Sequence, residues 1–340
     1  MRVLKPNEVN TQKMRSGLVI NKLPETTYKL GGFSKIDRVV LCENYDWRPY
    51  LPVFELQRRM VNGIEIDYWD CVTFGGNNQI EILNKKLYGY EINLNERISA
   101  VGNGTKPRIG NDPIEASEWE RKNGFSIGEQ KWDNDKPLTE EEFYNNGVLP
   151  EEWRIDAKNT LNYYETNYEV GACGNKLSGY FSYPQNTLDN LKYSPMACAV
   201  YGKYDLDSDG YVASPYYNLT THWVAVVAPG ENKKFWYVLD SESLSLVKFN
   251  WNYPFKLPIL KYLKKKTMIY KKKGQAGICL KTYGENTLLA FPDTLTWKTY
   301  TNGLKFDEIG GQWVDEWPYP IVGHFAVIKE LGAELPIIED

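Results

Sequence analysis

The sequence predicts an α+β protein in which a helical region comes first and antiparallel strands follow. Residues 71–88 have apolar side chains at the spacing of one helical face. Residues 222–241 contain two runs rich in β-branched and aromatic residues on either side of Pro229-Gly230-Glu231-Asn232, which is the pattern of a hairpin. From about residue 263 onward, apolar runs alternate with turn signals such as Asn302-Gly303, which favours further strands.

Composition indicates a folded protein and excludes several functional classes. The chain has 340 residues, of which 42% are hydrophobic and 25% charged, so wholesale disorder and a collagen-like repeat are excluded. The net charge of -4 argues against a nucleic-acid partner, because dedicated binders carry a basic excess. The sequence shows neither the ~18-residue apolar run of a membrane helix nor the apolar core of a signal peptide. We therefore expect no membrane partner and a location in the cytoplasm of the producing cell.

The cysteines offer one candidate nucleophile. They are Cys42, Cys71, Cys173, Cys198 and Cys279. Their odd number and the absence of a Cys-x-x-Cys pair exclude a zinc ribbon and argue against a disulfide framework. Cys71 begins the predicted helix, where the helix dipole favours a thiolate and free backbone N–H groups can bind an oxyanion. Because the preceding Asp70 would raise the thiol pKa, an imidazolium partner would be needed.

Only two histidines, His222 and His324, are available for acid–base chemistry near neutral pH. A hairpin turn centred on Glu231 places His222 directly opposite Asp240, with both side chains on one face of the sheet. A carboxylate in that position would hold the imidazole in one tautomer. The alternative is a structural histidine satisfied by local hydrogen bonds, and this is our interpretation of His324.

Residues 205–211 match the first half of a calcium loop, with carboxylates at positions 1, 3 and 5 and a backbone carbonyl at position 7. The candidate ligands are Asp205, Asp207, Asp209 and Tyr211. Position 12 is Tyr216 rather than glutamate, so the loop is not a complete EF-hand. We favour an acidic surface turn, with a structural calcium ion as the alternative, and expect no other cofactor.

The order of a cysteine at a helix start, a histidine on a later strand and a carboxylate on the next strand resembles papain-like (clan CA, C1-like) cysteine peptidases. The closer resemblance is to their divergent phage and metagenomic members. It is carried by Glu55-Leu56-Gln57, Asp67-Tyr68-Trp69-Asp70-Cys71-Val72-Thr73-Phe74, Lys122-Asn123-Gly124-Phe125 and Leu239-Asp240-Ser241. It implies a papain-like domain over 46–262, with a helical subdomain carrying the cysteine and an antiparallel β subdomain carrying the histidine. An N-terminal arm over 1–45 and a β-rich C-terminal extension over 263–340 would flank it.

The resemblance also implies roles for individual residues. Cys71 would be the nucleophile, His222 its general base and acid, and Asp240 the residue that orients the imidazole in place of the more usual asparagine. Gln57 would be the side-chain donor of the oxyanion hole. The substrate-binding positions would be Gly110, Asn111 and Trp223. No tryptophan follows Asp240-Ser241, where papain has a ring that shields its His–Asn pair.

The leading hypothesis is therefore a cysteine peptidase that cleaves a peptide or protein substrate through an acyl-enzyme on Cys71. Two alternatives remain open. The same triad would serve a phage endopeptidase that cuts peptidoglycan peptides. The chain would otherwise be a non-catalytic or weakly active structural component of a phage virion, with assembly or homo-oligomer contacts. The 25 tyrosines favour this last interpretation, because aromatic side chains build interfaces.

Overall fold

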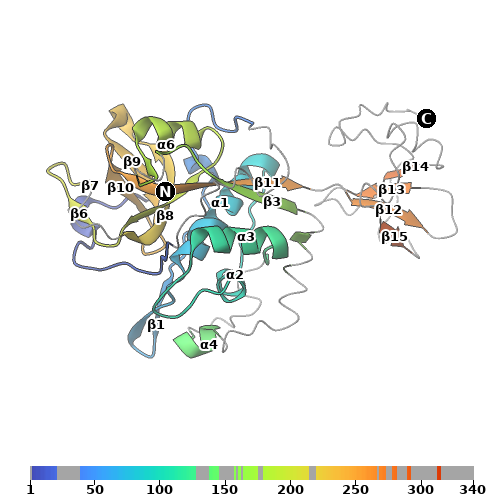
Figure 1. Ribbon diagram of the computed structural model, residues 1–340, viewed down its shortest axis with the longest axis horizontal. Coiled ribbons are helices and arrows are strands. Elements are labelled where there is room, and N and C mark those ends of the chain that lie inside the picture. Colours follow the sequence, from blue (N-terminus) through green and yellow to red (C-terminus); the bar gives the residue numbers. More distant parts are fainter. Residues whose placement is uncertain are drawn as a thin grey trace. The chain divides into compact units, whose positions relative to one another are not determined.

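The protein is described by a computed structural model covering residues 2–20, 39–127, 138–144, 157, 160–161, 164–174, 179–213, 220–265, 268–272, 278–281, 289–291 and 312–314. These residues form helices and a large, mainly antiparallel sheet, so the α+β class is as predicted (Figure 1). The chain divides into two compact units: Met1–Thr160 with Thr166–Leu263, and Leu161–Glu165 with Lys264–Asp340. The described residues of the predicted arm belong to the first unit, and His324 lies outside the described residues.

Helix α1, Cys71–Tyr88, has the predicted bounds. It ends at Gly89, whose φ of 77° lies in the left-handed region that favours glycine. Asp70 occupies the N-cap position, but its side chain makes no cap hydrogen bond. Gly75 lets the helix approach the sheet closely, because a Cβ there would lie 2.5 Å from Cδ1 of Trp223 in strand β8 (Thr220–Pro229).

The other α-helices among the described residues of the first unit are α2 (Glu96–Gly102), α3 (Pro113–Asn123), α4 (Glu140–Tyr144) and α6 (Pro184–Leu191). Asp112 caps α3, with its carboxylate accepting from two backbone N–H groups, and Pro113 takes the first helical position. Thr139 and Glu142 form a capping box at α4, as their spacing in the sequence indicates. Helix α2 was not predicted, although Asn95 caps it by accepting from the Ile98 N–H.

A nine-stranded sheet forms the body of the first unit, in the order β3-β11-β5-β8-β9-β10-β7-β6, with β4 also paired to β11. Its strands are β3 (Tyr164–Val170), β4 (Phe181–Ser182), β5 (Met196–Tyr201), β6 (Asp205–Leu206), β7 (Val212–Ala213), β8 (Thr220–Pro229), β9 (Phe235–Leu239), β10 (Leu246–Asn250) and β11 (Phe255–Lys265). Strands β5, β8, β9 and β10 pair antiparallel at its centre. Helix α1 packs on this centre, so Cys71 and His222 belong to elements in direct contact.

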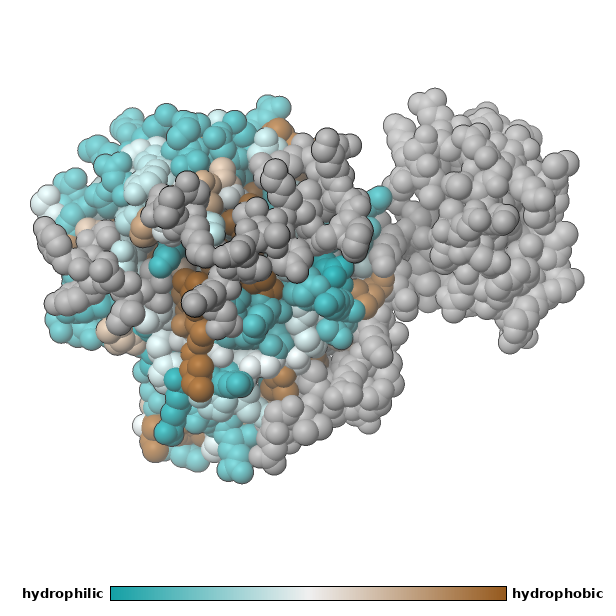
Figure 2. Space-filling model, in the orientation of Figure 1, coloured by the Kyte–Doolittle hydropathy of each residue, from teal (hydrophilic) through white to brown (hydrophobic). Residues whose placement is uncertain are grey.

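Smaller strands and turns complete the described chain. Strands β1 (Arg58–Val61) and β2 (Ile64–Asp67) form a hairpin directly before α1, and short 3-10 turns lie at Pro6–Glu8, Arg48–Tyr50 and Glu231–Lys233. In the second unit, β12 (Met268–Lys272), β13 (Ile278–Lys281), β14 (Leu289–Phe291) and β15 (Gln312–Val314) form a four-stranded sheet, as the β-rich pattern predicts. None of the described helices is long and apolar enough to cross a bilayer. Figure 2 shows a largely hydrophilic face with scattered apolar residues on the described part of the chain.

The predicted register of the His222 hairpin is wrong by two residues. Val226 pairs with Val238, so Val224 and not His222 stands opposite Asp240. The connection is the 3-10 turn Glu231–Lys233, and a bulge lies between Val226 and Ala228. The bulged residue is Val227, whose carbonyl accepts from the Trp47 N–H instead. A shift of two residues keeps every side chain on its original face, so His222 and Asp240 still lie on the same side of the sheet.

Two buried carboxyls join α1 to α2. Asn77 Nδ2 donates to Glu96 Oε1 at 3.1 Å, and Glu81 Oε1 accepts from the Leu94 N–H at 2.8 Å. Burial raises the pKa of Glu96 well above its ordinary value, and the neighbouring charge of Glu81 raises it further. The folded protein therefore retains a proton at Glu96 at pH values where an unfolded glutamate is ionised.

Glu96→Gln is expected to increase the free energy of unfolding at neutral pH. A raised folded pKa stabilises the protein fully below the unfolded pKa, ~4.3, and this stabilisation is lost as pH rises toward the folded pKa. The wild type should lose up to about 1.4 kcal/mol per pH unit in that window, whereas Glu96→Gln should not. Urea unfolding between pH 4 and 8, with the exposed Glu141→Gln as control, measures the difference. Parallel pH profiles for wild type and Glu96→Gln would contradict the assignment.

Candidate functional site

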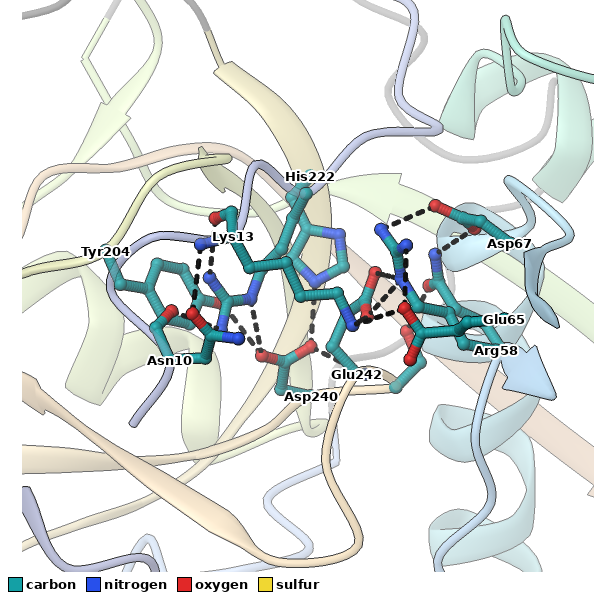
Figure 3. Close-up of polar contacts among 12 residues, drawn as sticks. Asn10, Lys13, Arg58, Glu65, Asp67, Tyr204, His222, Asp240 and Glu242 are labelled. Atoms are coloured by element: carbon teal, nitrogen blue, oxygen red, sulfur yellow. Dashed lines mark hydrogen bonds and ion pairs between the residues drawn. The ribbon is translucent and has the colours of Figure 1, made fainter. Parts of the chain in front are cut away.

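His222 and Asp240 are hydrogen bonded at the centre of the large sheet. Nε2 of His222, on β8, lies 2.8 Å from Oδ1 of Asp240, which follows β9, and both side chains are fully buried (Figure 3). The contact is a diagonal one, made possible by the reach of the two side chains across the strand pair. With Nε2 donating to the carboxylate, Nδ1 carries the lone pair, and Nδ1 is buried without a hydrogen-bond partner. The ring is thus oriented with one basic nitrogen left available.

Asp240 is held ionised by four neighbours. Besides His222, Oδ1 accepts from the Glu242 N–H at 3.0 Å, and Oδ2 accepts from the Tyr204 hydroxyl at 2.9 Å. Nε of the buried Arg15 lies 3.5 Å from Oδ2. Burial by itself raises the pKa of Asp240, but His222 and Arg15 outweigh it and hold the pKa well below its ordinary value. Asp240 can therefore stabilise a positive charge on the imidazole.

Cys71 lies at the first position of α1 and is fully buried. Its thiol is hydrogen bonded by the backbone N–H of Trp223, the residue that follows His222. Burial raises the pKa of Cys71 well above its ordinary value; the Trp223 N–H opposes this, and the charges of Asp70 and Asp67 add to it. Burial therefore disfavours the thiolate that the helix position was expected to favour.

Asp70 contributes to this electrostatic environment. Its carboxyl is fully buried, and neither oxygen has a hydrogen-bond partner. Burial raises its pKa well above the ordinary value, with the charge of Asp67 adding to the effect. Burial thus disfavours the charge on Asp70, the same charge that raises the pKa of the neighbouring Cys71.

Gln57 is buried next to the end of β9 rather than exposed to a groove. Its Oε1 accepts from Ser241 Oγ at 2.6 Å, and its Nε2 donates to Asp67 Oδ1 at 3.0 Å. The side chain thus links the segment before β1 to the residue that follows Asp240. One of the two Nε2 protons is used in this way, and the second remains for another acceptor.

The predicted substrate-binding positions meet the protein's own N-terminal segment. Asn111 N–H donates to the Gly17 carbonyl at 3.0 Å, and the Asn111 carbonyl accepts from the Val19 N–H at 2.9 Å. A Cβ at Gly110, whose φ is +90°, would lie 1.8 Å from the Gly17 oxygen. The backbone that was expected to hold an extended substrate strand therefore holds residues 17–19. Trp223 packs its ring in the apolar cluster that also contains Cys71.

In the acidic loop, the carboxylate of Asp207 accepts three hydrogen bonds. Oδ1 of Asp207 accepts from the backbone N–H groups of Asp209 and Tyr211, and Oδ2 accepts from Asn250 Nδ2 at 2.6 Å. Within the described part of the chain, no three histidine, cysteine or acidic side chains gather in a way that could hold a metal ion. The two backbone contacts of Asp207 are those of a side-chain-capped turn.

Sequence reasoning missed the contributions of Arg15 and Tyr204. Tyr204 precedes β6 and Arg15 lies in the N-terminal segment, yet both contact Asp240. Neither belongs to a local pattern that signals chemistry, because a single arginine or tyrosine in a loop is common. Together they bury Oδ2 of Asp240.

The sequence matches no protein-family model and no curated protein. Similar solved structures include digestive procathepsin L 3 of Tenebrio molitor larval midgut, with 14% identity, coverage of 76% of each chain and a TM-score of 0.41. The bromelain protease of Ananas comosus has 14% identity over 65% of this chain and 97% of that one, with a TM-score of 0.40. A cysteine protease of Carica candamarcensis has 14% identity over 64% and 96%, with a TM-score of 0.42. At these TM-scores the likeness assigns no role to any residue.

Proposed function

We propose that the protein is a papain-like cysteine hydrolase that cleaves peptide bonds. The observation that carries the proposal is the state of His222. Its Nε2 is hydrogen bonded to the ionised Asp240, and its Nδ1 is buried without a hydrogen-bond partner. The Cys71 thiol accepts from the backbone N–H of Trp223, the residue that follows His222. A nucleophile, a base and a residue that orients the base are the three parts that nucleophilic catalysis requires.

In the proposed reaction, the Cys71 thiol gives its proton to Nδ1 of His222, and the thiolate attacks the carbonyl carbon of the peptide bond. Asp240 stays ionised and stabilises the imidazolium through Nε2. Backbone N–H groups at the start of α1 and the second Nε2 proton of Gln57 are the available donors for the oxyanion. The imidazolium then protonates the leaving amine, and a water molecule, deprotonated by His222, hydrolyses the thioester.

A second candidate is the structural role without turnover. The observation that favours it is the burial of Cys71, whose thiol has a raised pKa in the described arrangement. A permanently closed site of this kind would keep the fold while losing the chemistry. We include both phage alternatives in the proposal. A peptidoglycan endopeptidase would differ from a general peptidase in its substrate, and a virion component would differ in its partners.

Cys71→Ala is expected to lower peptide hydrolysis by at least about 10³-fold, because a triad acts as a unit. The assay compares the wild type, Cys71→Ala and the opened variant Gly17→Ala described below, on a peptide library that includes peptidoglycan stem peptides. Cys198→Ala, which removes a buried thiol of strand β5, is the matched control and should retain activity. Equal hydrolysis by wild type and Cys71→Ala, or none by the wild type and Gly17→Ala, would refute the peptidase and favour the structural role.

A further inference from the structure

Residues 10–20, called the strap below, run through the site as a bound peptide would. The strap pairs in parallel with the backbone at Asn111, and on its other side the Leu18 N–H donates to the Thr221 carbonyl at 3.2 Å. Thr221 Oγ1 also donates to the Arg15 carbonyl at 2.7 Å. Thr221 directly precedes His222, so the strap lies between the Asn111 loop and the histidine strand. Its backbone hydrogen bonds hold any extended peptide, whatever its side chains.

The strap has no space for a side chain at Gly17, where it passes the Cys71 thiol. A Cβ on Gly17 would lie 2.7 Å from the Trp69 carbonyl oxygen and 3.1 Å from the Cys71 sulfur, and the φ of Gly17 is +114°. On the opposite side, the Gly17 carbonyl meets Gly110, which has no room for a side chain either. Two glycines therefore face each other at this point, and only glycine fits the position over Cys71.

Cationic side chains of the strap meet acidic groups. The Arg15 guanidinium lies 3.5 Å from Asp240 through Nε and 3.6 Å above the centre of the Tyr204 ring. Lys13 Nζ lies 2.7 Å from Oε2 of Glu242, and Figure 3 shows this contact among the polar contacts that surround Asp240 and Glu242. Arg15 is 5% exposed, and its guanidinium also donates to the strap's own carbonyls at Asn10 and Lys13, so the cation is buried between the strap, Asp240 and the Tyr204 ring.

The residue after the glycine is held by apolar contacts. Leu18 is 7% exposed and belongs to the cluster that contains Val72 of α1 and Ala116 of α3. Met14, by contrast, is 63% exposed and contributes nothing to the fit. The groove that the strap occupies, between the Asn111 loop and Thr221, thus contacts three features of the strap. They are a cation, a glycine two residues later, and an aliphatic residue directly after the glycine.

We propose that this groove is a recognition site for peptides with a cationic residue, one intervening residue, a glycine and an aliphatic residue, and that the strap is its resident and displaceable occupant. The inference rests on the proposed function for the identity of the site, but binding does not require turnover. The strap is held by main-chain hydrogen bonds, the buried Arg15, the ion pair of Lys13 with Glu242 and the apolar side chain of Leu18, which are contacts that a separate peptide makes equally well.

The test measures the alkylation rate of Cys71 by iodoacetamide in the full chain, resolved by peptide mass spectrometry from the other cysteines. Wild-type Cys71 should react slowly because the strap covers it. Gly17→Ala should accelerate labelling at least about tenfold, corresponding to ~1.4 kcal/mol of lost strap closure. The control is Gly63→Ala in the β1–β2 turn, which also has a positive φ but has open space around its Cβ, and it should leave the rate unchanged.

A synthetic peptide with the sequence of residues 10–20, added to Gly17→Ala, should restore protection in a saturable manner. Matched peptides with glutamine in place of the arginine, or alanine in place of the glycine, should protect at least tenfold less well at equal concentration. Equal protection by all three peptides, or no protection by any, would overturn the proposal. Rapid labelling of wild-type Cys71 would overturn it as well.

Lys13→Ala serves if Gly17→Ala does not fold, because it weakens the strap's contact with Glu242 without placing an atom in the groove. It should raise the labelling rate severalfold, and an unchanged rate in a folded protein would count against the strap as the cover of Cys71.

The outcomes separate this inference from the proposed function. If the peptide protects Cys71 but no hydrolysis is found, the recognition site is supported and the peptidase is refuted. If hydrolysis is found without selective protection, the peptidase is supported and the peptide preference is refuted.

Discussion

Asp240→Ala is expected to lower the free energy of unfolding by about 3–5 kcal/mol, the range for removing one partner from a buried charge pair. The substitution leaves the His222 ring, the Tyr204 hydroxyl and the Arg15 guanidinium buried and without their shared acceptor. Urea unfolding at pH 7 measures the loss. The control is Asp209→Ala, which removes an exposed carboxylate and should change stability by less than about 0.5 kcal/mol.

The pH dependence provides a second readout of Asp240. Because its folded pKa is lowered, ionised Asp240 contributes stability that is present above the unfolded value, ~3.9, and is lost as pH falls through the folded pKa. The stability gap between wild type and Asp240→Ala should therefore be constant near neutral pH and narrow in strong acid. A loss below about 1 kcal/mol at pH 7, no larger than one ordinary hydrogen bond, would show that Asp240 does not hold this network together.

Lys261→Met is expected to have a similarly large effect, also about 3–5 kcal/mol. Lys261 of β11 donates to Glu120 of α3, and the two side chains are 4% and 9% exposed. Burial raises the pKa of Glu120 even with Lys261 present. Without the lysine, the carboxylate would be left buried and unpaired, so the folded protein would have to take up a proton at Glu120.

The double variant Glu120→Leu, Lys261→Met should recover most of this loss, because replacing a buried pair with apolar residues is often close to neutral. The matched control is Lys122→Met on the same helix, whose exposed lysine pairs with Glu118 and should contribute less than about 1 kcal/mol. The measurement is urea unfolding of the four proteins. A double variant no more stable than Lys261→Met alone would show that the penalty does not come from the unpaired carboxylate.

Local patterns predicted the elements that they encode directly. The bounds of α1 follow from apolar periodicity between Asp70 and Gly89, and the α4 cap follows from Thr139 and Glu142. Helix α2 was missed because its seven residues, Glu96–Gly102, are too few to establish a period. The strand alternation around His222 predicted the correct face but the wrong partner. The bulge at Val227 depends on a contact with Trp47, which lies far away in the sequence.

The candidate site was also predictable only where local patterns encode it. Cys71, His222 and Asp240 were recognisable because Cys71 begins a helix and the other two lie near the ends of consecutive strands. The occupation of Gly110 and Asn111 by the strap was not recognisable. The strap has little periodicity, and its partner Thr221 lies 206 residues from Arg15. Such a contact leaves no trace in neighbouring residues, since loop closure over that distance is decided by the whole fold.

The sequence by itself determined the α+β class, the helix that begins at Cys71, and the shared face of His222 and Asp240, because 3.6- and 2-residue periodicities are properties of neighbouring residues. Only the tertiary structure decided that Arg15 and Tyr204 bind Asp240, that Cys71 is a buried thiol with a raised pKa, and that the strap fills the groove. These features depend on burial and on charges brought together from distant segments. Desolvation and charge proximity arise only when the chain is folded.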